Sequence, residues 1–223
     1  MNTPNQYDLP DAALALYLQQ HIDGFQGPLT STKFKGGQSN PTYLLEAASG
    51  RYVLRRKPPG KLLASAHAVD REFRVLQALH GSNVPVAKPY HLCSDESIIG
   101  SMFYVMEYID GKVFWDPSLP DCTTAQRAEI FDALIKTLAA IHSVSVEDSG
   151  LNDYGKPGNY FERQITRWSK QYRDSETQSI AAMDALIEQL PMRCPEDDGC
   201  VSLVHGDFRI DNLMFDNQGQ HVL

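Results

Sequence analysis

Apolar residues recur along the first half of the chain at two different spacings. In residues 11–22, positions 14, 18 and 22 are apolar and fall on one face of a helix, so a first helix is predicted with Asp11 as its N-terminal cap. Segments 33–35, 42–46 and 51–57 are typical of strands, and Gly36-Gly37 predicts a turn between the first two. The segment 102–109 is a further strand, ended by Asp110-Gly111.

Helical spacing dominates the remainder of the chain. Helices are predicted over 64–80, over 123–142 from the capping-box pattern Thr123-x-x-Gln126, over 160–172, and over 180–190 up to Pro191. The later half of the 123–142 helix is apolar all round and is expected to be deeply buried. The 160–172 helix has an aromatic stripe that is expected to pack in the core: Phe161, Ile165, Trp168 and Tyr172.

A polar loop lies between two short apolar runs near the end of the sequence. Segments 201–204 and 213–215 are predicted as short buried strands, with a further strand at 220–223. Phosphoryl transfer from ATP needs a carboxylate that accepts the hydroxyl proton and an oxygen ligand for Mg²⁺ a few residues later. Asp207 and Asn212 have that spacing, and Arg209 could stabilise the transferred phosphoryl group. The alternative is a strand-loop-strand with surface polar residues.

Composition narrows the possible partners. The chain has 223 residues and a formal charge of −8, which argues against nucleic acid or an anionic membrane as a partner. An anionic substrate such as ATP would therefore need local cations and a metal. The four cysteines have no C-x-x-C spacing, so a zinc site is not expected. Without an 18-residue apolar run or a signal-peptide pattern, we expect a soluble, cytoplasmic protein.

Three further segments are candidates for nucleotide binding. The loop with Gln38, Ser39 and Asn40 could lay backbone N–H groups against phosphates, although an ordinary hairpin fits it as well. Arg55 stands where a kinase carries its phosphate-binding lysine, and Glu72 could pair with it; the alternative is a solvated basic edge strand. In a kinase, the 102–109 strand would lead into the hinge, with these adenine contacts: Met106, Glu107 and Ile109.

With these segments in order, the sequence resembles the aminoglycoside phosphotransferase and choline kinase-like superfamily, over nearly the whole chain. It is most similar to the kinase-like domain of acyl-CoA dehydrogenase family members 10 and 11 and its stand-alone bacterial relatives. Four stretches carry the resemblance: 34–42, 53–63, 114–117 and 205–212. The resemblance implies an α+β, protein-kinase-like two-lobe fold. Residues 1–110 would form a small N-lobe with an antiparallel sheet, and residues 111–223 part of a mainly helical C-lobe.

The resemblance also implies roles for the site residues. Asp207 would be the catalytic base, Asn212 a Mg²⁺ ligand, Arg55 the phosphate-binding cation and Glu72 its partner, with ATP and Mg²⁺ as cofactors. A second acidic metal ligand is expected just beyond Leu223, together with more of the larger lobe. We therefore expect the chain to be a truncated kinase domain, inactive by itself.

The acceptor is less well defined. A small-molecule hydroxyl is expected, either on a hydroxyacyl or hydroxy-acid compound, as in the most similar subgroup, or on an aminoglycoside or amino alcohol, as in the wider family. Four cations on the 160–173 segment favour an anionic acceptor, unless they form a solvated face: Arg163, Arg167, Lys170 and Arg173. A nucleotide-binding pseudokinase and a structural module remain the alternatives, and the sequence does not indicate an oligomeric state.

Overall fold

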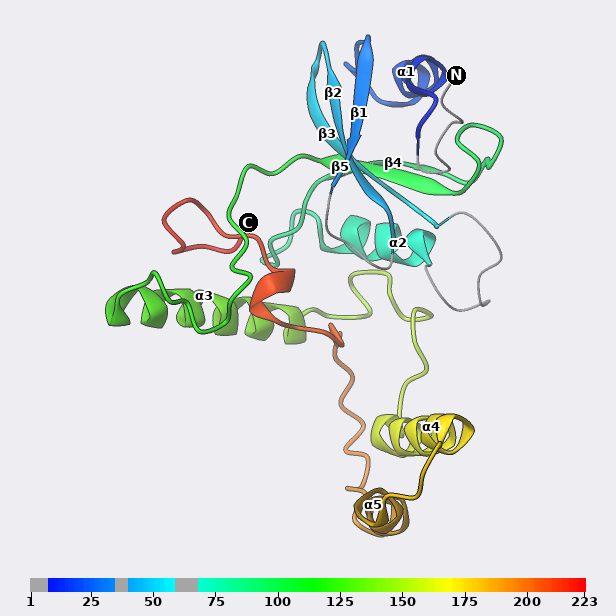
Figure 1. Cartoon of the computed structure of the whole chain (residues 1–223), viewed down its shortest axis with the longest axis vertical. Coiled ribbons are helices and arrows are strands. Elements are labelled where there is room, and N and C mark those ends of the chain that lie inside the picture. Colours follow the sequence, from blue (N-terminus) through cyan, green and yellow to red (C-terminus); the bar gives the residue numbers. More distant parts are fainter. Residues whose placement is uncertain (1–7, 35–39, 59–67) are drawn as a thin grey trace. The chain divides into compact units, whose positions relative to one another are not determined.

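The computed structural model describes residues 8–34, 40–58 and 68–223. It has an α+β fold in which one helix precedes a five-stranded sheet, a second lies between its third and fourth strands, and further helices follow (Figure 1). The strands are β1 (Leu29–Lys33), β2 (Thr42–Ala47), β3 (Gly50–Arg56), β4 (Pro89–Cys93) and β5 (Phe103–Glu107). The helices are α1 (Asp11–His21), α2 (Val69–Leu79), α3 (Thr124–His142), α4 (Tyr160–Ser175) and α5 (Ala181–Met192), with a 3₁₀ turn at Ile210–Asn212.

The sheet is antiparallel throughout, with strand order β1-β2-β3-β5-β4. β5 thus lies beside β3, and residues that are directly opposite on neighbouring strands point to the same face. One face packs on α1, whose Leu14 and Leu18 are fully buried against the sheet. The other face packs on α2, where Val69 and Phe73 contact Tyr104. The sheet is therefore covered by a different helix on each side.

A second cluster of buried apolar side chains surrounds α3. Ile130 and Ala133 on the helix pack with residues from 114–119 and 210–215. The predicted capping box at the start of α3 is confirmed: the Gln126 N–H donates to Thr123 Oγ1 at 3.3 Å, and the Thr123 N–H donates to Gln126 Oε1 at 2.9 Å. The predicted burial of the later half is wrong in part, because Ile135 is 58% exposed.

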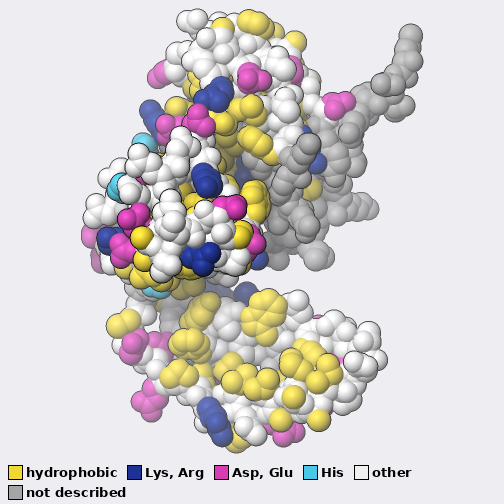
Figure 2. Space-filling model, turned by 60° about the vertical axis from the view of Figure 1, so that its left-hand side comes forward, with side chains coloured by type: hydrophobic (Ala, Val, Ile, Leu, Met, Phe, Trp, Pro, Cys, Tyr) yellow, Lys and Arg dark blue, Asp and Glu magenta, His cyan; other side chains and the backbone are white. Residues whose placement is uncertain are grey.

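The chain divides into two compact units, one made of residues up to His142 together with His205–Leu223, the other of Ser143–Val204. The predicted lobe boundary at residue 110 is a different division and stays a prediction. The Ser143–Val204 unit contains α4 and α5, and apolar side chains are visible on the surface of this part of the molecule (Figure 2). The predicted burial of the aromatic stripe on α4 is wrong here, since Phe161 and Trp168 are 59% and 57% exposed.

Three smaller predictions need correction. Asp11 does not cap α1; its carboxylate instead accepts a hydrogen bond from the Ser31 N–H on β1, at 3.0 Å. Residues 201–204 are not a buried strand, since Val201 and Val204 are half exposed and no strand is formed there. The strand predicted at 220–223 is reduced to a single bridge between Phe215 and Val222. Among the described residues, no helix has the length and apolar character needed to cross a membrane.

Candidate functional site

A row of polar side chains crosses the face of the sheet that packs on α2. Arg55 on β3 is directly opposite Thr42 on β2 and Tyr104 on β5. Val53 is opposite Leu44 and Met106 in the same way. These apolar residues are two positions along their strands from the polar row, so they lie on the same face. The face therefore presents a cation beside an apolar strip, which are the two surfaces that a nucleotide's phosphates and base require.

Glu72 on α2 holds the cation of this row. Its Oε2 lies 2.8 Å from Arg55 Nε and accepts a hydrogen bond from the Tyr104 hydroxyl at 3.1 Å. Its Oε1 accepts a hydrogen bond from Asn40 Nδ2 at 2.8 Å. The predicted pairing of Arg55 and Glu72 is thus present, although the Nε–H is not aligned for a hydrogen bond and the contact is an ion pair.

The environment of this ion pair is partly shielded from water. The side chains of Arg55 and Glu72 are 33% and 36% exposed, whereas Tyr104 is buried. Burial and the nearby charge of Glu72 raise the pKa of the Tyr104 hydroxyl, so Tyr104 remains a neutral donor over the physiological range. A neutral donor and a cation together hold the Glu72 carboxylate in place.

The segment that follows β5 corresponds to the predicted hinge. The Glu107 N–H donates to Lys88 O at 2.8 Å, so this backbone donor is already engaged within the chain. Arg51, at the start of β3, lies 4.1 Å above the Tyr108 ring and 3.5 Å from Asp110. These two contacts of Arg51 hold the residues on either side of Ile109. The proposed adenine contacts of Met106, Glu107 and Ile109 stay predictions.

The loop with Asp207 and Asn212 is anchored by alternating apolar side chains. Ile210, Leu213 and Phe215 are buried in the cluster around α3. The polar residues between them are left at the surface, and the 3₁₀ turn over Ile210–Asn212 brings residue 212 back toward residue 207. The polar loop predicted between two short strands is thus held by buried side chains at its own positions 210, 213 and 215.

Asp207 and Asn212 are in direct contact. Asn212 Nδ2 donates to the Asp207 carboxylate oxygen Oδ2 and to the Asp207 backbone oxygen, both at 2.9 Å. Arg209 Nε lies 3.4 Å from Asp207 Oδ1, while its NH2 group donates to Asp211 Oδ2 at 3.0 Å. The Asp207 side chain is 64% exposed, so a substrate hydroxyl can reach it.

The chemistry of this loop fits a magnesium ion held together with nucleotide phosphates. Mg²⁺ prefers oxygen ligands and usually takes only one or two from the protein, with the rest from phosphates and water. Asn212 uses its amide nitrogen on Asp207, which leaves its amide oxygen for a cation. Asp216 is engaged elsewhere, because it accepts hydrogen bonds from the Gln220 N–H and His221. In the part of the chain that the structure describes, three or more acidic, histidine or cysteine side chains nowhere gather to hold a metal.

Two predicted site residues, Gln38 and Ser39, lie outside the described residues. Other contacts of the site were not predicted from the sequence. Sequence analysis assigned Asn40 to nucleotide binding and did not find that its side chain contacts Glu72, nor that Tyr104 does. Strand alternation could have placed Tyr104 on the same face as Met106, but the register between β3 and β5 was needed to put it beside Arg55.

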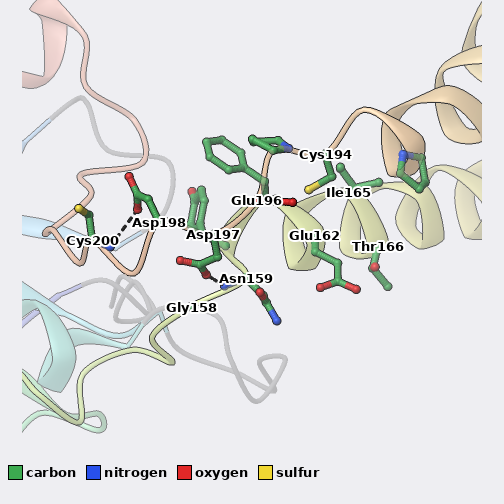
Figure 3. Close-up of a pocket in the computed structure, with 14 residues that line it drawn as sticks. Gly158, Asn159, Glu162, Ile165, Thr166, Cys194, Glu196, Asp197, Asp198 and Cys200 are labelled. Atoms are coloured by element: carbon green, nitrogen blue, oxygen red, sulfur yellow. Dashed lines mark hydrogen bonds between the residues drawn. The ribbon is translucent and has the colours of Figure 1, made fainter.

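A cavity of about 560 Å³ lies in the Ser143–Val204 unit, between the start of α4 and residues 194–200 (Figure 3). Its lining includes Tyr160 and Phe161 and four acidic residues: Glu162, Glu196, Asp197 and Asp198. Backbone N–H groups of Asn159 and Gly199 donate to Asp197 and hold the pKa of that carboxyl below its ordinary value. None of the residues predicted for catalysis or nucleotide binding lines this cavity.

The fold is that of the kinase-like phosphotransferase class. The chain belongs to the phosphotransferase enzyme family, whose model matches residues 30–223. It is 46% identical over 214 residues to acyl-CoA dehydrogenase family member 11 of Rattus norvegicus, a match that covers 94% of this chain and 28% of that protein. It is also 46% identical over 216 residues to family member 10 of Mus musculus, covering 96% and 20%. The chain thus spans about a quarter of these curated relatives.

Solved structures have the same fold. A protein from Ralstonia eutropha, designated a candidate aminoglycoside phosphotransferase, is 50% identical with a TM-score of 0.87, and the match covers 97% of this chain and 63% of that one. The aminoglycoside phosphotransferase APH(2")-IIa, solved in a ternary complex with streptomycin and ATP, has a TM-score of 0.61 at 16% identity and covers 100% and 70%. At that identity the likeness shows the fold alone.

Proposed function

We propose that the chain is the catalytic part of an ATP-dependent kinase that transfers the γ-phosphoryl group to a hydroxyl of a small molecule. The observation that carries this proposal is the contact between Asp207 and Asn212, because it joins an exposed carboxylate to an amide whose oxygen remains for a metal. The ATP complex of the structural neighbour supports a nucleotide as donor.

In this mechanism Asp207 orients the acceptor hydroxyl and takes its proton. A bond forms between the hydroxyl oxygen and the γ-phosphorus, while the bond from that phosphorus to the bridging oxygen breaks and its electron pair leaves with ADP. Arg55, oriented by Glu72, binds the α- and β-phosphates. Asn212 would hold magnesium together with the phosphates, and the metal would supply positive charge to the transferred group.

The predicted contact of Arg209 with the transferred phosphoryl group stays a prediction. Its guanidinium lies against Asp207 and Asp211. This position lets it orient the Asp207 carboxylate, and contact with the phosphoryl group requires that it leave Asp211. We therefore retain Asp207 as the catalytic base and treat Arg209 as a catalytic residue that acts beside it.

For the acceptor we propose a hydroxyacyl or hydroxy-acid compound. Support comes from the relatives, which are called acyl-CoA dehydrogenase family members. The cations of α4 lend little support, because most of them are already engaged. Arg163 donates to backbone carbonyls, Lys170 lies 2.5 Å from Asp174, and Arg173 lies 2.6 Å from Asp184.

The second candidate acceptor is an amine such as choline or an aminoglycoside. It is favoured by one observation, the four acidic residues that line the cavity beside α4. Both candidates share the same donor and the same base, so only the acceptor distinguishes them.

The test offers the full-length natural protein ATP and Mg²⁺ with 3- or 4-hydroxyacyl-CoA, free hydroxy acids, choline and kanamycin-type amines. ADP release and the mass of the product are measured for each. A phosphorylated hydroxyacyl product is expected. If only amines are phosphorylated, the acceptor is an amine and the hydroxyacyl assignment is wrong. Nucleotide binding without transfer to any acceptor would indicate a pseudokinase. Failure to bind ATP would overturn the kinase proposal.

A further inference from the structure

Asn40 combines deep burial with a polar contact that the proposed chemistry does not explain. It is only 2% exposed, and its Nδ2 donates to Glu72 Oε1 at 2.8 Å. A buried amide needs hydrogen-bond partners, but an ordinary core position would be filled at lower cost by an apolar side chain. The carboxylate that it contacts is the one that holds Arg55. Asn40 is therefore connected to Arg55, the proposed phosphate-binding cation, through Glu72.

The backbone around Asn40 is fixed from two sides. Its carbonyl oxygen accepts a hydrogen bond from Thr42 Oγ1 at 3.1 Å. The next carbonyl, of Pro41, accepts one from the Arg56 N–H at 3.0 Å, which ties this point to the end of β3. The amide of Asn40 thus comes from a held segment, so it can impose an orientation on Glu72 instead of following it.

The Glu72 carboxylate is held by donors from three parts of the sheet. Asn40 precedes β2 and occupies Oε1, whereas Arg55 on β3 and Tyr104 on β5 both lie at Oε2. With Oε1 free, the carboxylate could rotate about its Cγ–Cδ bond and offer Arg55 a less favourable geometry. The contact at Oε1 makes Asn40 the residue that sets the orientation of the carboxylate plane that faces the cation.

We propose that Asn40 is a positioning residue of the nucleotide site, whose buried amide orients Glu72 and thereby places Arg55 for the phosphates of ATP. This inference rests on the proposed kinase function. It assigns Asn40 a role through its side chain, distinct from any contact between the backbone of its loop and the phosphates. Tyr104 serves the same carboxylate from the other oxygen.

The test compares MgATP binding by four forms of the full-length protein: wild type, Asn40→Ala, Glu72→Gln and the double variant. Asn40→Ala is expected to raise the Kd for MgATP about 5–10-fold and to change kcat less, because binding of the phosphates is what Arg55 supplies. In the Glu72→Gln background the same substitution is expected to change Kd by less than about twofold, because its effect passes through Glu72.

Two further variants separate positioning from general loss of stability. Tyr104→Phe keeps the ring and removes only the donor to Oε2, so it is expected to raise Kd in the same direction even if Asn40→Ala does not fold. Ser101→Ala is the matched control, because Ser101 is also buried beside β3 but bonds Arg56 and the Lys57 carbonyl, not Glu72. It is expected to lower the unfolding midpoint and leave Kd unchanged.

Equal Kd values for wild type, Asn40→Ala and Tyr104→Phe would overturn the positioning role and leave the kinase proposal intact. An undiminished effect of Asn40→Ala in the Glu72→Gln background would also overturn it, since Asn40 would then act by another route. A wild-type protein that does not bind MgATP would overturn the kinase function first and this inference with it.

Discussion

Lys112 and Phe215 exchange two backbone hydrogen bonds: the Lys112 N–H donates to Phe215 O at 2.7 Å, and the Phe215 N–H donates to Lys112 O at 2.8 Å. Lys112 follows the segment after β5, and Phe215 follows the loop with Asp207 and Asn212. The pair therefore links the proposed adenine-binding edge to the proposed catalytic loop through backbone alone.

This link explains why residue 111 is glycine and gives a first prediction. A Cβ at Gly111 would lie 2.5 Å from Met214 Cγ and 2.7 Å from Phe215 O. Gly111→Ala is expected to destabilise the protein by about 1–3 kcal/mol, because a backbone atom cannot move aside as a flexible side chain can. Urea unfolding measures the loss. Gly155→Ala is the control, since Gly155 has open space around its Cβ position, and equal losses in both variants would contradict the argument.

The second prediction concerns the catalytic base. Asp207→Asn keeps the size of the side chain and removes its capacity to accept a proton, so kcat is expected to fall about 10²–10⁴-fold with little change in the Kd for ATP. The measurement is ADP release by the full-length protein in the presence of the unphosphorylated acceptor that the wild type uses. Asp132→Asn, which alters an exposed carboxylate paired with Lys136 on α3, serves as the control. A kcat within a few-fold of wild type would remove Asp207 from the mechanism.

The third prediction concerns the cation of the nucleotide site. Arg55→Ala removes the charge proposed for the α- and β-phosphates, so the KM for ATP is expected to rise by about tenfold or more while the KM for the acceptor changes little. Arg55→Lys should recover part of the binding, because it restores the charge without the planar guanidinium. Steady-state kinetics over both substrates checks the split, and an unchanged KM for ATP would assign Arg55 to structure alone.

Features with local causes were predicted from the sequence with most success. The Thr123–Gln126 capping box lies within one helical turn, and Leu14, Leu18 and Ile22 follow one helical stripe. The Arg55–Glu72 pair was predicted because kinases carry such residues at those places. Contacts that depend on register were missed: Tyr104 meets Glu72 only because β5 pairs with β3, and Asp11 bonds Ser31 across a loop.

Periodicity was least informative where burial depends on another part of the protein. The stripe with Phe161 and Trp168 lies along α4 as its spacing indicates, yet both side chains are more than half exposed. A periodic pattern identifies the residues that share a face, but it does not say what covers that face. The same reason explains the exposed Ile135 on α3.

The fourth prediction concerns pH and the α1 side of the sheet. His91 on β4 accepts or donates a hydrogen bond with the Tyr17 hydroxyl at 2.9 Å, and its ring centre lies 4.8 Å from that of His21. Burial lowers the pKa of His91, and the neighbouring His21 lowers it further. The unfolded chain therefore binds a proton at higher pH than the folded one, so stability is present above the ordinary histidine pKa and is lost as pH falls through the lowered pKa of the folded state.

Urea unfolding at a series of pH values from neutral to mildly acidic tests this fourth prediction. His91→Gln keeps a polar side chain opposite Tyr17 but cannot take up the proton, so its stability is expected to depend less on pH over this window than that of the wild type. His80→Gln is the control, because His80 is an exposed residue at the end of α2. Parallel curves for wild type and His91→Gln would show that His91 does not cause the acid sensitivity.

The last prediction concerns magnesium. Asn212→Ala removes the amide oxygen proposed as a metal ligand and also the two hydrogen bonds that Nδ2 donates to Asp207. The Mg²⁺ concentration needed for half-maximal ADP release is expected to rise, and saturating Mg²⁺ should restore part of kcat, because phosphates and water supply the other ligands. Asn212→Asp keeps an oxygen ligand but places a carboxylate against Asp207, so it should need less Mg²⁺ than Asn212→Ala while lowering kcat through repulsion. Asn152→Ala, at an exposed asparagine of the other compact unit, is the control. If all these forms titrate with Mg²⁺ alike, the metal is held by other groups and Asn212 acts only as a support for Asp207.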